Sequence, residues 1–280
     1  MSTTAQPTIS VCTIVKDERE RISDLLSSLV DFADEIVIVD TGSTDDTVAR
    51  IESFIAEHPS APIRFLTYTA AGGFHYGLAK DFSIDNATKE YVIVLDADER
   101  LTSEFKQTVR CFIAKEEPVV ASVVRKDVLL PHLVDYPDRI IRRASGVRYG
   151  GGELSRVHEQ LVSAFPAKNF SGVISHEQKW NHYVMRPQRI FFQLELQIDR
   201  TPKTKSLIGH WLRAVWYFWY RFNKIYFKRS LYKDGRLGFK YAFLRAVDAF
   251  LIEFFVGLKP SEQELRRMLG GGHEATGTIQ

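Results

Sequence analysis

Apolar residues in the first hundred positions follow two spacings, one typical of strands and the other of helices. Continuous apolar runs at Ile9–Val15, Ile36–Val39 and Tyr91–Leu95 predict β-strands, with a further strand near Ile63–Thr67. Between them, apolar positions recur with helical periodicity and predict helices with one buried face. Strands that alternate with helices form parallel sheets. We therefore predict an α/β fold with a mostly parallel central sheet.

The pattern changes beyond a helix predicted at 103–115. Further strands are expected at Val119–Arg125 and Arg139–Arg143, and three successive glycines at 150–152 form a joint. From residue 190 onward the spacing is helical. The second half is thus expected to add strands to the fold and then a C-terminal helical extension.

Charged residues follow three of the predicted strands. They are Lys16-Asp17-Glu18, the segment 40–46 and Asp96-Ala97-Asp98. In a parallel sheet the carboxyl ends of the strands lie at one edge, where ligands bind. We expect these three segments to face one cleft.

Two of these acids, Asp96 and Asp98, are separated by a single residue at the end of a wholly apolar strand. Such a pair could hold one hard divalent cation, which would bridge the phosphate oxygens of a nucleotide diphosphate. The alternative is a pair of solvated loop acids. Asp40 is similarly open to two interpretations, as an acceptor of hydrogen bonds from a base or ribose or as a cap of the turn at Gly42.

Together the three segments resemble glycosyltransferase family 2, whose fold is of the GT-A class. The segments are ISVCTIVKDE at 9–18, EIVIVDTGSTD at 35–45 and YVIVLDADE at 91–99, in the order and spacing of that family. The resemblance implies that Glu18 and Asp40 contact the nucleoside. It further implies that Asp96 lies by the ribose and the metal, and that Asp98 ligates Mg or Mn.

The resemblance also extends to Lys80-Asp81, where family members often have Arg-Asn or Lys-Asn. Lys80 keeps a cation available for the diphosphate, whereas Asp81 departs from the pattern. Lys16, in the first segment, joins the predicted donor-binding residues.

The second half looks like the lipopolysaccharide-core glucosyltransferase-like branch of this family. The segments that carry this likeness are DRIIRR at 138–143, RVHE at 156–159 and KDGRLG at 233–238. An inverting transfer needs a carboxylate that deprotonates the acceptor hydroxyl. Glu159 is the candidate base, with Glu153 and Asp138 as alternatives, and Glu159 could instead be a structural partner of Arg156.

Basic residues serve two predicted purposes. Arg139 and Arg142 are expected to bind donor phosphates or acidic groups of the acceptor. From Arg200 to Arg245 there are twelve basic residues and one acid, Asp234, so this segment favours an anionic partner.

A helical wheel over residues 211–228 separates aromatic from basic side chains. One side gathers the large apolar residues and the other the basic ones, as in helices that lie on anionic membranes. An aromatic stripe of this kind is also common in protein cores. The residues assigned to membrane contact are Trp211, Phe218, Phe222, Arg213, Arg221, Lys224 and Lys228. Since this separation suits lipid better than a phosphate groove, we predict no nucleic-acid partner.

The N-terminus lacks the organisation of a signal peptide, and no stretch of about 18 residues is free of charge. We therefore expect a cytoplasmic protein on the inner face of the cytoplasmic membrane. Its expected partners are a nucleotide-diphosphate sugar donor, a glycolipid or polysaccharide acceptor and an anionic membrane surface.

These expectations divide the chain into five parts. They are a flexible N-terminus (1–8), a nucleotide-sugar-binding subdomain (9–115), an acceptor-side subdomain (116–189), basic and aromatic helices (190–269) and a disordered tail (270–280). Two other readings compete with an inverting glycosyltransferase. One is a sugar nucleotidyltransferase, which would need a Gly-rich loop after the first strand, and the other is a non-catalytic membrane adaptor.

Overall fold

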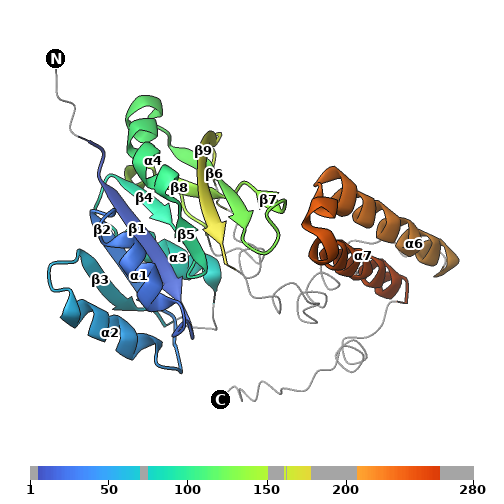
Figure 1. Cartoon of the computed structure of the whole chain (residues 1–280), viewed down its shortest axis with the longest axis horizontal. Helices are drawn as coiled ribbons and strands as arrows, with labels where there is room; N and C mark the ends of the chain where they lie inside the picture. Colours follow the sequence, from blue (N-terminus) through green and yellow to red (C-terminus); the bar gives the residue numbers. More distant parts are fainter. Residues whose placement is uncertain (1–5, 70–74, 151–160, 162, 178–206, 259–280) are drawn as a thin grey trace. The chain divides into compact units, whose positions relative to one another are not determined.

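The computed structural model of the chain describes residues 6–69, 75–150, 161, 163–177 and 207–258 (Figure 1). These residues fall into two compact units. The first contains residues up to 128 together with 134–177, and the second contains 129–133 together with the C-terminal segment from 178. The predicted tail at 270–280 lies outside the described residues.

Parallel strands form the first half of the α/β unit (Figure 1). They are β1 (Ile9–Val15), β2 (Glu35–Asp40), β3 (Ile63–Thr67) and β4 (Tyr91–Val94), with β1 between β2 and β4 and with β3 beyond β2. The connecting helices are α1 (Ile22–Leu29), α2 (Thr47–Glu57) and α3 (Tyr76–Asp85). The predicted parallel α/β core is confirmed.

These strands are apolar throughout because both faces of the sheet are covered. On β2, Ile36 and Ile38 pack into one cluster with α1, while Val37 and Val39 pack into a second cluster with Ile84 of α3. Alternate side chains of a strand point to opposite faces. An unbroken apolar run is therefore what a strand buried on both sides requires.

Beyond β4 the sheet contains both antiparallel and parallel strand pairs. The added strands are β5 (Glu99–Leu101), β6 (Val120–Asp127), β7 (Val134–Asp135), β8 (Asp138–Arg142) and β9 (Lys168–His176), and the sheet order is β3-β2-β1-β4-β8-β6-β9-β5, with β7 on β6. Helix α4 (Ser103–Glu116) is capped by Thr102, whose hydroxyl accepts from the Phe105 N–H. A short 3-10 turn spans Arg143–Ser145. Because β8 pairs with β4, the expected boundary at 115/116 falls inside one sheet.

The second unit is helical. Helix α6 (Leu207–Asn223) continues into a π-helical turn (Lys224–Lys228), and a 3-10 turn (Leu231–Asp234) leads into α7 (Gly235–Leu258), which packs against α6. The fully buried alanines Ala214, Ala242 and Ala246 allow the two helices to approach closely. Among the described helices, none combines the length and the apolar character that crossing a bilayer requires.

Candidate active site

The loops that follow β1 and β2 are joined by hydrogen bonds. The backbone N–H of Asp17 donates to Ser43 Oγ (2.9 Å), and Asp17 Oδ1 accepts from the Thr44 N–H (2.6 Å). The Glu18 N–H donates to Thr47 Oγ1 (2.8 Å). Asp17 has φ +56°, in the left-handed region that Asp tolerates better than most residues. Two strand ends therefore form one connected platform.

Asp40 closes the turn after β2. Its carboxylate accepts from the backbone N–H groups of Gly42 (3.0 Å) and Ser43 (3.2 Å), and Gly42 has φ +96°. Of the two interpretations of Asp40, the turn cap is thus present in the structure. Near it, Lys16 is exposed, and Glu18 Oε2 accepts from the Arg21 guanidinium (3.0 Å).

Asp96 lies between two buried cations at the end of β4. Lys80 Nζ donates to Asp96 Oδ1 (2.8 Å), and Arg139 Nη2 donates to Asp96 Oδ2 (2.5 Å). Burial by itself would raise the pKa of Asp96, but the charges of Arg139 and Lys80 outweigh it and hold that pKa well below its usual range. Both predicted cations, Lys80 and Arg139, therefore lie at the predicted acid.

Two further charged residues, Glu99 and Arg125, hold Asp96 and Arg139 in place. Glu99 is fully buried, and its carboxylate accepts from the Asp96 N–H (3.0 Å), from Arg139 (2.7 Å) and from Arg125 (2.8 Å). Arg125 in turn makes a bidentate pair with Asp135, at 2.9 and 2.6 Å. Both oxygens of Asp96 are thus engaged by cations, and each keeps a second lone pair.

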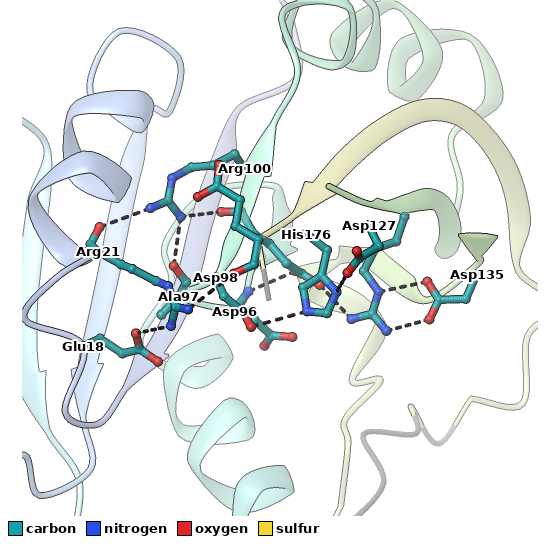
Figure 2. Close-up of polar contacts among 12 residues, drawn as sticks. Glu18, Arg21, Asp96, Ala97, Asp98, Arg100, Asp127, Asp135 and His176 are labelled. Carbon is teal, nitrogen blue, oxygen red and sulfur yellow. Dashed lines mark hydrogen bonds and ion pairs between the residues drawn. The ribbon is translucent and has the colours of Figure 1, made fainter. Parts of the chain in front are cut away.

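Asp98 instead faces a histidine from a distant strand (Figure 2). His176 Nε2 lies 3.3 Å from Asp98 Oδ2, and His176 Nδ1 lies 3.7 Å from Oδ2 of the buried Asp127. The β5–β9 pairing places Glu99 opposite His176, which brings the histidine to Asp98. Burial would raise the pKa of Asp98, but the hydrogen bond and charge of His176 prevail and lower it. The pKa of His176 is raised, because Asp98 outweighs the opposing effect of burial.

Asp98 and His176 fit a divalent cation better than Asp96 and Asp98 do. Within the described part of the chain, no three His, Cys, Asp or Glu side chains gather around one possible ion position. Two donor atoms 3.3 Å apart are nonetheless close enough to bind one ion, and an open site can take its remaining ligands from a diphosphate and water. Carboxylate oxygen with imidazole nitrogen is a donor set that suits Mn²⁺.

Arg142 does not join this site. The β4–β8 register places it opposite Tyr91, at the start of β4 rather than at its end. Its Nε donates to the Tyr91 hydroxyl (3.0 Å), its guanidinium lies over the Tyr91 ring, and its Nη2 donates to the Glu117 carbonyl (2.8 Å). Since β8 runs antiparallel to β4, Arg139 lies by the end of β4 and Arg142 by its start. Donor binding by Arg142 stays a prediction.

The candidate base Glu159 lies outside the described residues, as do Glu153 and Arg156. The remaining alternative, Asp138, begins β8, where its Oδ1 accepts from the Ser122 hydroxyl (2.5 Å). The structure thus gives Asp138 a structural contact.

In the helical unit, the aromatic side chains do not all lie on one exposed face. Phe218 and Phe222 are half-buried and pack on Phe243 and Phe239 of α7, with ring centroids 5.7 Å apart in both pairs. Trp211, predicted to contact lipid, is 50% exposed, and Trp216, which lies outside the predicted stripe, is 57% exposed. Exposed aromatic side chains are therefore more widely spread over α6 than one stripe.

The assigned basic residues also differ from one another. Arg221 and Lys228 are exposed, and Lys224 lies over the Tyr220 ring. Arg213 is 3.1 Å from the buried Glu253, which also bonds His210 (2.9 Å). Arg213 therefore helps to satisfy a buried carboxylate within the helical unit.

The KDGRLG segment builds the entry to α7. Asp234 accepts from the backbone N–H of His132 (3.3 Å) and bonds the ring of the same residue (2.5 Å). Gly235 has φ +60°, and a side chain at Gly238 would collide with the Leu231 carbonyl. Within the described contacts, this segment therefore shapes the turn before α7.

Comparisons with known proteins agree with this geometry. Residues 10–149 match the family Glycosyl transferase family 2. The chain is 28% identical to the lipopolysaccharide core biosynthesis glycosyltransferase LpsC of Rhizobium meliloti (strain 1021) over 264 residues, which cover 87% of this chain and 89% of LpsC. It is also 28% identical to the glycosyltransferase SunS of Bacillus phage SPbeta over 184 residues, 63% of this chain and 40% of SunS.

Among solved structures, the mannosyltransferase PcManGT from Pyrobaculum calidifontis, in complex with GDP-Man and Mn²⁺, shares the fold with a TM-score of 0.51. The two chains are 15% identical, and the alignment covers 96% of this chain and 80% of PcManGT. Because the family match spans half of the sequence, the chain belongs to glycosyl transferase family 2 and has the GT-A fold.

Proposed function

We propose that this protein transfers a sugar, with inversion, from a nucleotide-diphosphate sugar to a cell-envelope glycan or glycolipid related to the lipopolysaccharide core. The observation that carries the proposal is the cluster after β4, where the Asp98–His176 pair lies beside Asp96 and its two cations. The full-length likeness to LpsC supports the choice of acceptor.

Each part of the cluster has a role in this proposal. Asp98 and His176 would hold a Mg or Mn ion, which supplies positive charge to the departing diphosphate. A solved relative in fold, PcManGT, contains Mn²⁺ together with its nucleotide sugar, and this supports a divalent ion here. Lys80 and Arg139 hold Asp96 at the ribose side of the donor.

The donor and acceptor would be held by loops from several strands. Glu18 and Asp40 would contact the nucleoside, and Lys16, exposed at the end of β1, would approach the phosphates. Glu159 would remove the proton from the acceptor hydroxyl as its oxygen attacks the anomeric carbon. The bond from that carbon to the diphosphate breaks on the opposite face, and the nucleoside diphosphate leaves.

A screen of UDP-, GDP- and dTDP-sugars by thermal unfolding, with Mn²⁺, Mg²⁺ or EDTA, tests the donor site. We expect one donor class to stabilise the protein in the presence of metal, by about 2.7 kcal/mol at a hundredfold excess over its Kd. Stabilisation that persists unchanged in EDTA would contradict the metal, and no stabilisation by any donor would contradict the function.

Product analysis separates this proposal from its two rivals. A glycosyltransferase releases a nucleoside diphosphate from the sugar nucleotide. A sugar nucleotidyltransferase would instead form sugar nucleotide from nucleoside triphosphate and release pyrophosphate. An adaptor would bind lipid and yield neither product.

The proposal includes a peripheral position on the inner face of the cytoplasmic membrane. The segment from Arg200 to Arg245 is strongly basic, and large apolar side chains on α6 are exposed. Examples are Ile208, Leu212 and Trp219, at 73%, 59% and 58% exposure. Apolar and aromatic groups beside basic ones suit the headgroup region of an anionic bilayer.

Sedimentation with vesicles of phosphatidylglycerol and phosphatidylethanolamine tests this position. Reversal of charge at Arg221, Lys224 and Lys228 should release the protein into the supernatant, because each basic residue contributes about 1 kcal/mol near an anionic surface. The matched control reverses three exposed basic residues of the α/β unit, Arg50, Arg64 and Lys115, and should stay bound. Equal binding by both triple variants would remove the membrane claim.

A further inference from the structure

Asp81 uses both of its carboxylate oxygens to hold one piece of backbone. Oδ1 accepts from the Tyr149 N–H (2.7 Å), and Oδ2 accepts from the Gly150 N–H (2.8 Å). A carboxylate can accept at both oxygens, whereas the amide of Asn has one oxygen and an NH₂ group that is itself a donor. Two neighbouring N–H groups therefore favour Asp at this position.

The backbone held by Asp81 carries a side chain that lies against the donor-site cation. The Tyr149 ring is 2% exposed, and Lys80 Nζ lies 5.3 Å from its centroid. The Tyr149 hydroxyl also approaches the Asp138 carbonyl (3.4 Å). An ammonium group over an aromatic face is attracted to it, more strongly where water is excluded.

Lys80 connects the Tyr149 ring to Asp96, the acid that follows β4. It is 1% exposed and donates to Asp96 at 2.8 Å. A contiguous series of contacts thus runs from Asp81 through Tyr149 and Lys80 to Asp96. Asp81 is itself the residue after Lys80 on α3, so one helix supplies both the cation and the support for the ring beside it.

We propose that Asp81 is a positioning residue of the donor site. By fixing the backbone at residues 149 and 150, it keeps the Tyr149 ring against Lys80 and the ammonium group in contact with Asp96. This role rests on the proposed function, because the ion pair it supports is the one expected at the donor. It gives a reason for the departure from Lys-Asn at this point of the sequence.

A graded pair of variants tests the role. Asp81→Asn keeps one acceptor oxygen and Asp81→Ala keeps none, so the KM for the nucleotide sugar should rise about threefold to tenfold in the first and roughly tenfold to a hundredfold in the second. The kcat should change less than KM in both. Deuterium exchange at the Tyr149 and Gly150 amides, followed by mass spectrometry, should quicken in the same order.

Asp85→Asn is the matched control. Asp85 lies one turn further along α3 and pairs with Arg148 at 2.5 and 3.0 Å, on the exposed side of the same loop. Its loss removes a surface ion pair, which contributes little, so the KM of this variant should stay within about twofold of the wild type.

Tyr149 provides a second test should the Asp81 variants fold poorly. Tyr149→Phe retains the ring beside Lys80 and should bind donor nearly as the wild type does, whereas Tyr149→Leu should raise KM roughly tenfold. Wild-type KM in Asp81→Ala or in Tyr149→Leu would overturn the role while the proposed function stands. A wild-type protein without affinity for any nucleotide sugar would overturn the proposed function itself.

Discussion

The two edges of the central sheet both carry polar and charged side chains, but these side chains have different partners. Where β1 and β2 begin, Glu35 accepts from the Ser10 hydroxyl (2.5 Å) and from the Thr88 N–H (2.7 Å). Where β4 ends, Asp96 and Glu99 accept from ammonium and guanidinium groups. Glu35 at the first edge is thus held by neutral donors, whereas Asp96 and Glu99 at the second edge are held by opposed charges from several elements.

This difference matters more for function than the number of charged residues does. The Glu35 carboxylate, held by a hydroxyl and a backbone N–H, joins the starts of β1 and β2 to the segment before β4. Opposed charges can exchange partners with a phosphate or a metal ion, because an incoming charge replaces one that is already there. The contrast predicts that variants of the acids after β4 lose turnover, whereas variants of Glu35 lose stability.

The largest expected effect is that of Asp98→Ala. Loss of the proposed metal carboxylate should reduce divalent-dependent donor turnover roughly a thousandfold, since a catalytic metal contributes several kcal/mol to charge stabilisation. Thermal unfolding without donor should change little. Glu57→Ala, which removes an exposed acid at the far end of α2, is the control and should keep its turnover. Normal turnover by Asp98→Ala would remove Asp98 from the metal site.

Asp127→Asn should have a smaller effect, on metal affinity. Asp127 lies on the Nδ1 side of His176 and can orient the ring so that Nε2 faces Asp98. Loss of such a supporting carboxylate typically weakens metal binding about tenfold to a hundredfold. Mn²⁺ titration followed by electron paramagnetic resonance measures this directly, with Asp85→Asn as the control. An unchanged Mn²⁺ affinity would mean that His176 needs no support from Asp127.

Glu35→Gln should leave turnover unchanged and lower the free energy of unfolding by about 1–3 kcal/mol, because it disturbs hydrogen bonds to a buried acid. Burial would raise the pKa of Glu35, but its bonds to Ser10 and Thr88 prevail and lower it. The stability from the ionised form is therefore present above the unfolded-state pKa, about 4.3, and is lost as pH falls through the folded-state value. Denaturant unfolding of both proteins from pH 7 down to pH 3 should show the gap between them closing.

The parts of this arrangement that depend on residues close together in the sequence could be predicted. The strands that end at Val15, Asp40 and Val94 are marked by unbroken apolar runs, and the acids that follow them are adjacent along the chain. His176 could not be predicted, because only the pairing of β9 with β5 brings it to Asp98. No spacing or motif links these two residues.

The direction of β8 explains another limit of the sequence. Arg139 and Arg142 look equivalent in the run DRIIRR, yet one is buried beside Asp96 and the other lies over Tyr91. Their positions depend on the antiparallel pairing with β4, which the sequence of a single strand does not reveal. Which arginine lies beside Asp96 is therefore set by the pairing of the sheet rather than by the segment itself.

Arg139 links Asp96 to Glu99, and Glu99 holds the Asp96 backbone, so the protein's own side chains hold this loop. An incoming nucleotide sugar would meet groups that are already oriented, and little conformational entropy would be lost there on association. Such preorganisation also spares the reaction the cost of turning dipoles toward the leaving group as its charge develops. The rigidity of the buried Arg139 guanidinium would then favour both binding of the proposed donor and cleavage of the bond between its sugar and its diphosphate.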